Sequence, residues 1–123
     1  LTQSLLPFMM KDKMGRIIHI SSKGGIDGEQ GTLAYSVSKH GVIGLSRVLS
    51  KEYAKFNITS NVLALGAFGV GMYNELHDEI KKYIIDKTPS KKIGNTSNIV
   101  NAIKFLIHSD YVNGSTINID GGM

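Results

Sequence analysis

The chain of 123 residues has no cysteine and no long hydrophobic run. Without cysteine it can form neither a disulfide nor a thiolate metal site, and it is compatible with the reducing cytoplasm, where we expect it to be located. No apolar stretch reaches the roughly 18 residues that a membrane-spanning helix requires. Residues 1–7, LTQSLLP, also lack the basic segment and the cleavage site of a signal peptide. These absences predict a protein without membrane association.

A strong excess of one charge sign is also missing, since the net charge is only +4. The lysines are scattered and are not interleaved with aromatic residues, so no nucleic-acid partner is predicted. The four histidines are His19, His40, His77 and His108, and no two of them have metal-ligand spacing with carboxylates nearby. We interpret all four as structural or surface residues and predict no metal site.

Strand and helix patterns alternate along the chain. Short apolar or β-branched runs predict strands, and apolar residues at helical spacing predict helices. The predicted strands are 16–20, 58–65 and 115–119, and the predicted helices are 1–10, 32–56, 74–87 and one that begins near 96. We expect Gly15 to end the first helix, Thr32 or a neighbouring loop residue to cap the second, and Thr96 or Ser97 to cap the last. Helical crossovers between strands require a parallel sheet with helices on both faces, so residues 1–123 are predicted to form one α/β unit.

Ligands bind beyond the carboxyl ends of the strands in open α/β sheets. Three segments occupy such positions: Ser21-Ser22, the 66–71 segment and Gly121-Gly122. The glycines of the 66–71 segment do not have the G-x-G-x-x-G spacing of a dinucleotide-binding fingerprint. We therefore interpret that segment as a flexible loop.

Tyr35 and Lys39 are four residues apart on a predicted helix and so share one face. A free phenol has a pKa of about 10, too high for efficient proton transfer near neutrality, and a nearby ammonium group lowers it. The pair could act as a general acid/base, in which Lys39 supplies the field and Tyr35 moves the proton. Ser22 lies thirteen positions upstream, at the end of a strand, and its hydroxyl could orient a carbonyl oxygen beside the phenol.

Each of these residues also has a simpler interpretation. A tyrosine and a lysine at this spacing are often just a core and a surface residue of an ordinary helix. Serines after a strand are common turn residues. The pair alone does not decide between the two interpretations.

In their order along the chain, these motifs resemble the short-chain dehydrogenase/reductase family, most closely its compact oxidoreductases typified by 3-oxoacyl-(acyl-carrier-protein) reductases. The similar segments are GRIIHISS, AYSVSKHGVIGLSRVLSKEYAKFNITSNVLALG and the ending DYVNGSTINIDGGM. The specific features are a serine after a strand, Tyr-x-x-x-Lys at the right distance, and a strand–glycine turn beyond the helix. The resemblance covers nearly the whole chain and implies a Rossmann-like, doubly wound parallel sheet.

The resemblance implies a role for each matching position. Ser22 would hydrogen-bond the substrate carbonyl or hydroxyl, Tyr35 would donate or accept the proton, and Lys39 would lower the tyrosine pKa and hydrogen-bond the nicotinamide ribose. The hydride would pass between NAD or NADP and a small-molecule carbonyl or secondary alcohol. Backbone groups around Gly66 and Phe68 would lie against the nicotinamide end of the cofactor.

The same resemblance implies roles for two helices. The 74–87 helix would be the mobile substrate-binding segment, with apolar positions that could face a substrate or the core. The helix that carries Ser38, Gly41 and Gly44 would join a four-helix dimer interface, where small residues permit close packing. We therefore expect a homo-oligomer, either a dimer or a tetramer.

Two features depart from the family pattern. Leu65-Gly66 stands where Pro-Gly is usual, and Val70 replaces a threonine that often hydrogen-bonds near the cofactor's carboxamide and phosphates. The family's glycine-rich phosphate turn, and the residue that selects NAD or NADP, would lie before Leu1. We therefore expect residues 1–123 to be the C-terminal catalytic half of such a domain, and the choice between NAD and NADP stays open.

Two alternative functions remain at this point. One is a catalytically idle relative kept for oligomerisation or binding, which Leu65 and Val70 favour and which the presence of Ser22, Tyr35 and Lys39 opposes. The other is an epimerase or dehydratase of the extended relatives, which also use Tyr-x-x-x-Lys. The compact DGGM ending disfavours this second alternative.

We predict that the 123-residue chain alone binds NADH and NADPH weakly or not at all, because it contains no phosphate-cradling turn at a helix N-terminus. Titration of the cofactor's fluorescence with the purified chain measures the affinity directly. Measurable NAD(P)H-dependent carbonyl reduction by the purified chain would refute this prediction.

Overall fold

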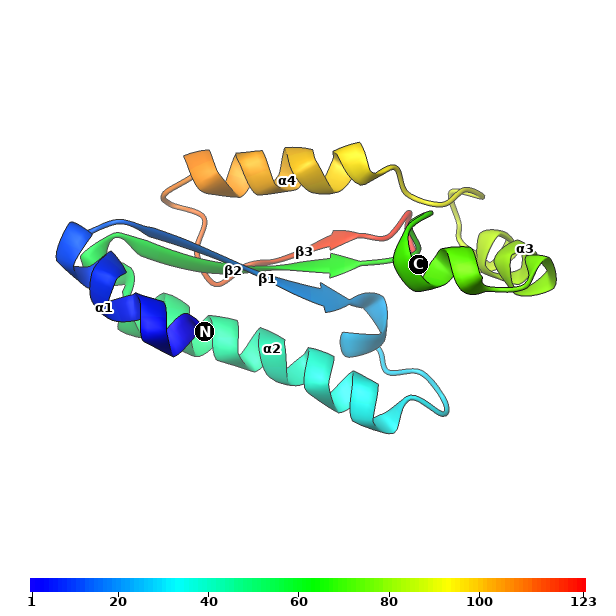
Figure 1. Cartoon of the computed structure of the whole chain (residues 1–123), viewed down its shortest axis with the longest axis horizontal. Helices are drawn as coiled ribbons and strands as arrows, with labels where there is room; N and C mark the ends of the chain where they lie inside the picture. Colours follow the sequence, from blue (N-terminus) through cyan, green and yellow to red (C-terminus); the bar gives the residue numbers. More distant parts are fainter.

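The computed structural model describes residues 1–71 and 73–123 in full and the backbone alone at Met72. Helices and strands alternate along the chain, as the sequence predicts (Figure 1). In chain order they are α1 (Thr2–Asp12), β1 (Gly15–Ser22), the 3-10 turn η1 (Lys23–Gly25), α2 (Leu33–Glu52), η2 (Ala54–Phe56), β2 (Ile58–Leu65), η3 (Gly71–Glu75), α3 (Asp78–Lys87), α4 (Thr96–His108) and β3 (Thr116–Ile119). The bounds of β2 are the predicted ones. Thr32 occupies the N-cap position of α2, but its side chain makes no capping hydrogen bond to the helix.

The prediction that Gly15 ends the first helix is wrong. Helix α1 ends at Asp12, and Lys13 closes it in the left-handed conformation, with φ of 49°. Gly15 is instead the first residue of β1. A Cβ atom at that position would lie only 2.8 Å from Met9 Sδ, so the start of the strand passes close under the helix.

The prediction of one helix over 74–87 is also wrong. The segment divides into η3 and α3, because Leu76 and His77 between them have extended backbone conformations. The cap of α4 differs from the prediction too: Asn95 precedes the first turn, and its side chain accepts a hydrogen bond from the Ser97 amide at 2.9 Å.

The three strands form a parallel sheet in the order β1-β2-β3. Helices α1 and α2 lie on one face and α4 lies on the other (Figure 1). In the register of the sheet, Ser22 is level with Leu65, and Leu65 is level with Ile119. The carboxyl ends of all three strands therefore meet at one edge, where the sequence places the candidate chemistry.

The core is built around β2, which is buried along its whole length up to Ala64. Ile58, Val62 and Leu63 are at most 1% exposed, and Leu106 of α4 is 0% exposed. The apolar and β-branched residues of this segment, followed by Gly66, explain why its bounds are predictable from sequence, although the buried strand also contains Thr59, Ser60 and Asn61. On the α2 face, Ser46 and Ser60 satisfy each other's hydroxyls at 3.0 Å.

Two asparagine side chains connect β2 to the segment that leads into β3. The Asn61 amide nitrogen donates to the Val112 carbonyl at 2.8 Å, and its oxygen accepts from the Ser115 amide at 3.0 Å. Asn113 accepts from the Ser60 amide and donates to the Ser50 carbonyl. These bonds satisfy buried polar groups and fix how far β3 advances along β2.

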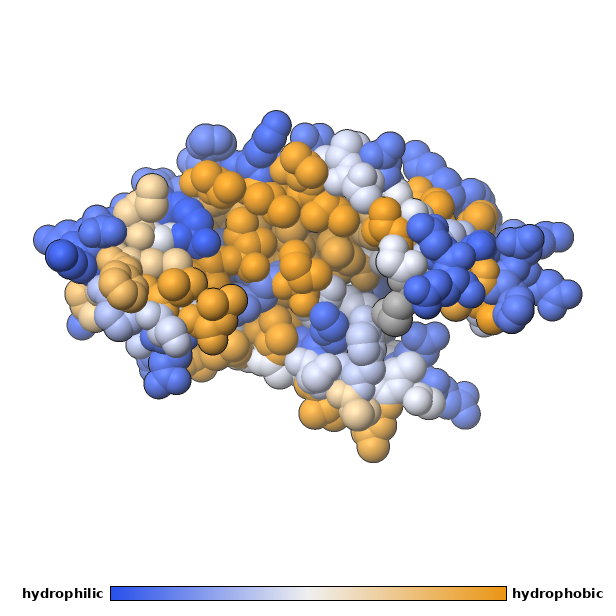
Figure 2. All heavy atoms as spheres, viewed as in Figure 1, coloured by the Kyte–Doolittle hydropathy of each residue, from blue (hydrophilic) through white to orange (hydrophobic). Residues whose placement is uncertain are grey.

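Strand β1 is an edge strand, with β2 as its neighbour on one side only within the described residues. Figure 2 shows that apolar surface gathers across the middle of the molecule, between α4 and α1. A hollow of about 350 Å³ lies there, lined by β1 residues together with Leu1, Leu5 and Met9 of the α1 region. Exposed apolar surface of this kind marks a contact site in many soluble proteins.

The four histidines occupy different parts of the fold. His19 is on β1, and the ring nitrogen Nε2 is buried without a hydrogen-bond partner in the described structure. Burial lowers the pKa of His19 below its usual value, because a buried imidazolium loses hydration. Protonation of His19 therefore opposes folding as the pH falls below that usual value. Among the described residues, no cluster of histidine and carboxylate side chains could hold a metal ion, and no helix is long and apolar enough to cross a membrane.

Candidate active site

Ser22 is the last residue of β1, at the carboxyl edge of the sheet. It is also the N-cap residue of η1, and its Oγ accepts a hydrogen bond from the Gly24 amide at 3.3 Å. Because the hydroxyl oxygen is used as an acceptor in this turn, its hydrogen is available for donation to another group. Ser22 can thus serve as a hydrogen-bond donor at the strand end.

Tyr35 and Lys39 lie in the first two turns of α2 and share one face of that helix. The Lys39 Nζ atom is 5.8 Å from the centre of the Tyr35 ring. The same nitrogen donates to the carbonyl of Ile20 in β1 at 3.2 Å. The ammonium group is therefore held between the tyrosine ring and the end of the strand that carries Ser22.

The Ser22 and Tyr35 side chains both approach Gly24. A Cβ atom at Gly24 would lie 3.7 Å from Tyr35 Cε1 and 3.9 Å from Ser22 Oγ. The Ser22 hydroxyl and the Tyr35 ring thus both lie close to this one position, which carries no side chain. The structure brings Ser22, Tyr35 and Lys39 together although their order in the sequence separates them.

The turn after β1 approaches α2 very closely at Gly25. A Cβ atom there would lie 2.6 Å from Lys39 Cβ and 2.8 Å from Ser21 Oγ, so only glycine fits without displacement. The Ser21 hydroxyl donates to the Lys39 carbonyl at 2.9 Å, and His40 Nδ1 lies 2.8 Å from the Gly25 carbonyl. Strand β1 and helix α2 are joined at this point.

A cleft of about 450 Å³ opens beside Ser22 at the carboxyl ends of β1 and β2. Its walls combine bare backbone at Gly24 and Gly66 with apolar and charged side chains. The apolar residues are Leu65, Ala67, Ile84 and Met123, and the charged ones are Lys23, Asp27, Glu29 and Lys87. Lys23 and Asp27 form an ion pair with each other. The cleft can take a small organic molecule with an apolar part.

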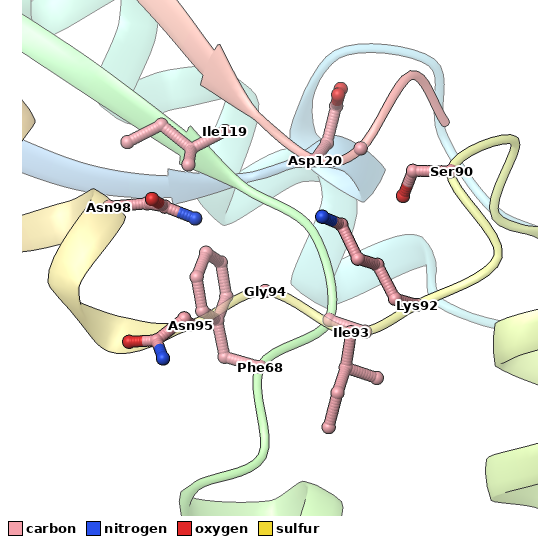
Figure 3. Close-up of a pocket in the computed structure, with 11 residues that line it drawn as sticks. Phe68, Ser90, Lys92, Ile93, Gly94, Asn95, Asn98, Ile119 and Asp120 are labelled. Carbon is pink, nitrogen blue, oxygen red and sulfur yellow. The ribbon is translucent and has the colours of Figure 1, made fainter.

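The two remaining candidate residues occupy different places. Gly66 lines the cleft, and a Cβ atom there would lie 2.7 Å from Asp120 Cα, because the chain after β3 passes against it. The Phe68 side chain is 7% exposed and packs on Gly94. It lines a separate cavity of about 190 Å³, where its ring lies near Asn98 and Lys92 (Figure 3). The sequence could suggest where the Phe68 backbone lies, but not this direction of its ring.

No sequence pattern assigned a role in the site to Ser21, Gly25 or His40. The hydroxyl of Ser21 is adjacent in sequence to that of Ser22, and Ser21 is only 2% exposed. Adjacent residues of a strand point to opposite faces of the sheet, so the alternation along β1 indicates that Ser21 and Ser22 have different roles. Nothing in the sequence indicated that His40 would reach Gly25, since that contact depends on the packing of the loop.

All 123 residues match the family model described as enoyl-(acyl carrier protein) reductase. The chain belongs to the short-chain dehydrogenase/reductase family. The parallel sheet with helices on both faces is thus part of a Rossmann-like fold, as the sequence predicts.

Among similar proteins, this short-chain dehydrogenase/reductase is 39% identical to nodulation protein G of Azospirillum brasilense, over 99% of the chain and 50% of that protein. It is 38% identical to 3-oxoacyl-(acyl-carrier-protein) reductase of Haemophilus influenzae, over 100% of the chain and 52% of that protein. The crystal structure of levodione reductase superposes with a TM-score of 0.92 and 31% identity, over 98% of the chain and 50% of that structure. The chain spans about half the length of the curated relatives that it matches.

We predict that Gly25→Ala destabilises this short-chain dehydrogenase/reductase by about 1–3 kcal/mol, because the added methyl group overlaps the backbone turn at Lys39. Urea denaturation followed by circular dichroism measures the change in the free energy of unfolding. Gly41→Ala is the matched control: nothing lies within 4 Å of its Cβ position, and alanine in a helix is favoured by about 1 kcal/mol. Equal stability of the two variants would contradict the close fit at Gly25.

Proposed function

We propose that the chain carries the catalytic residues of an NAD(P)-dependent oxidoreductase that interconverts a carbonyl group and a secondary alcohol. The observation that carries this proposal is that the Ser22 hydroxyl and the Tyr35 ring both approach Gly24, with the Lys39 ammonium group beside the tyrosine ring, next to a cleft at the carboxyl edge of the sheet. Membership of a family of reductases supports the same reaction class.

Each of the three side chains has a chemical task in this proposal. Ser22 donates its hydroxyl hydrogen to the substrate oxygen, and the Gly24 amide holds the hydroxyl in that direction. Tyr35 gives its phenolic proton to the oxygen during reduction and takes it back during oxidation. The positive charge of Lys39 stabilises the phenolate that forms when Tyr35 has given up its proton.

The residues present also fit a nicotinamide cofactor. Gly24 and Gly66 expose bare backbone to the cleft, so a flat ring can approach the peptide groups without obstruction by side chains. The proposal assigns the ribose to Lys39 and Tyr35, and the nicotinamide end to the backbone near Gly66 and Phe68. The cofactor, NAD or NADP, supplies the hydride that no side chain can carry.

The substrate is proposed to be a small molecule with a carbonyl or hydroxyl group and an apolar part. The apolar part fits the side of the cleft formed by Leu65, Ile84 and Met123. Relatives named acetoacetyl-CoA reductase and 3-oxoacyl-(acyl-carrier-protein) reductase are consistent with reduction of a carbonyl group. Ile84 belongs to α3, so that helix contributes to the wall, as expected of a substrate-binding segment.

Tyr35→Phe tests the proposal in the protein expressed at the length its gene encodes. Loss of the phenolic proton should abolish turnover, a fall of at least about 10²-fold in kcat. The melting temperature should hardly change, because the Tyr35 side chain is 43% exposed. Tyr111→Phe, at a fully exposed tyrosine, is the control. Unchanged turnover in Tyr35→Phe would count decisively against the assignment, and a wild-type protein without NAD(P)H-dependent turnover would favour a catalytically idle relative.

The outer face of α2 supports the proposed homo-oligomer. Val37, Leu45 and Val48 are 63%, 47% and 52% exposed, and Gly41 and Gly44 lie between them on the same face with nothing within 4 Å of their Cβ positions. Together these five residues form an apolar stripe. Its two glycines have no side chains, so a second helix can approach closely there. We propose that two copies of the chain pack through this stripe.

Val48→Glu tests the oligomer, because it places a charge within the stripe. We expect the mass measured by analytical ultracentrifugation to fall to that of a smaller assembly, while circular dichroism stays unchanged. Val100→Glu makes the same change at a valine that is 48% exposed on α4, in the opposite layer, and serves as the control. An unaltered mass for Val48→Glu would exclude this face as the interface.

A further inference from the structure

Two residues outside the proposed catalytic set fasten the turn after β1 to helix α2. We propose that Ser21 and His40 are positioning residues that clamp this turn, and thereby keep the Ser22 hydroxyl and the Tyr35 ring close to each other at Gly24. The effect of the clamp on turnover rests on the proposed function. Its effect on the geometry does not.

Ser21 ties the end of the strand to the helix. Its hydroxyl donates to the Lys39 carbonyl at 2.9 Å, and its side chain is almost fully buried. Lys39 is inside α2, where a carbonyl already accepts a bond from the amide four residues later. The helix does not require the bond from Ser21. This bond instead fixes the distance between β1 and the turn of α2 that contains Lys39.

His40 ties the far end of the same turn. Its Nδ1 atom lies 2.8 Å from the Gly25 carbonyl. A carbonyl can only accept, so Nδ1 must carry the hydrogen. The His40 side chain is otherwise exposed, and hydrogen-bonding to Gly25 is its contact with the loop in the described structure.

The two ties enclose Ser22. One holds the residue immediately before it and the other holds Gly25, three positions after it, and their helical ends are the consecutive residues Lys39 and His40. The turn between them cannot swing away from α2 without breaking one of the two bonds. Gly24, within this turn, is the residue whose Cβ position lies near both Ser22 Oγ and the Tyr35 ring.

The geometric test uses nuclear Overhauser effects between the α hydrogens of Gly24 and the Tyr35 ring in the protein. His40→Leu removes the donor at an exposed position, so the variant should fold. His40→Asn keeps an N–H donor close to the place of Nδ1. We expect the signal to weaken strongly in His40→Leu and Ser21→Ala and to persist in His40→Asn. Ser38→Ala is the control, because its hydroxyl bonds only the Tyr35 carbonyl of its own helix.

The kinetic test uses the same variants. Misplacement of Ser22 relative to Tyr35 should lower kcat by about 10- to 100-fold in His40→Leu, with KM changed by less than about twofold. His40→Asn should recover most of that loss, and Ser38→Ala should match the wild type. If Ser21 and His40 only stabilised the fold, their variants would have a lower melting temperature but would not show a lower kcat with a nearly constant KM.

The proposal is overturned if the Gly24–Tyr35 signal keeps its wild-type strength in His40→Leu, or if His40→Asn is as impaired as His40→Leu. Absence of reductase turnover in the wild-type protein would contradict the proposed function. The nuclear Overhauser measurements on the variants would then decide alone whether the clamp exists. If Ser21→Ala fails to fold, the two His40 variants still decide the outcome.

Discussion

The close approach of Gly25 to the Lys39 turn of α2 is the contact on which the candidate site depends. No side chain fits between the two backbones, so the turn after β1 and the first half of α2 are held at a fixed separation. That separation determines where Ser22 points and which side chains it meets. Ser22, Tyr35 and Lys39 come from two elements, and this contact is where the two elements are joined.

The joint is rigid because both of its sides pack on the same central strand. Helix α2 and strand β1 each contact β2, and the Ser46–Ser60 hydroxyl pair fixes α2 against that strand. Asn61 and Asn113 then fix the segment before β3, which brings Asp120 against Gly66. Positions at the carboxyl edge of the sheet therefore depend on buried polar groups at some distance from it.

Much of this architecture can be predicted from the sequence, for identifiable reasons. The bounds of β2 follow from the apolar and β-branched residues between Asn57 and Gly66, and the shared face of Tyr35 and Lys39 follows from helical periodicity. Elements whose limits depend on single backbone conformations are less predictable: Lys13 closes α1 in the left-handed region, and the extended Leu76 divides the 74–87 segment. The direction of the Phe68 ring and the bond between His40 and Gly25 depend on tertiary packing, which local pattern does not encode.

Helix α2 has 20 residues and so forms a rod of about 30 Å. One side of the rod presents Tyr35 and Lys39 to β1, and the opposite side carries the apolar stripe from Val37 to Val48. If copies of the chain associate through the stripe, dilution to nanomolar protein would dissociate them and expose the apolar side of α2 to water, while Tyr35 and Lys39 stay on the other side of the same helix.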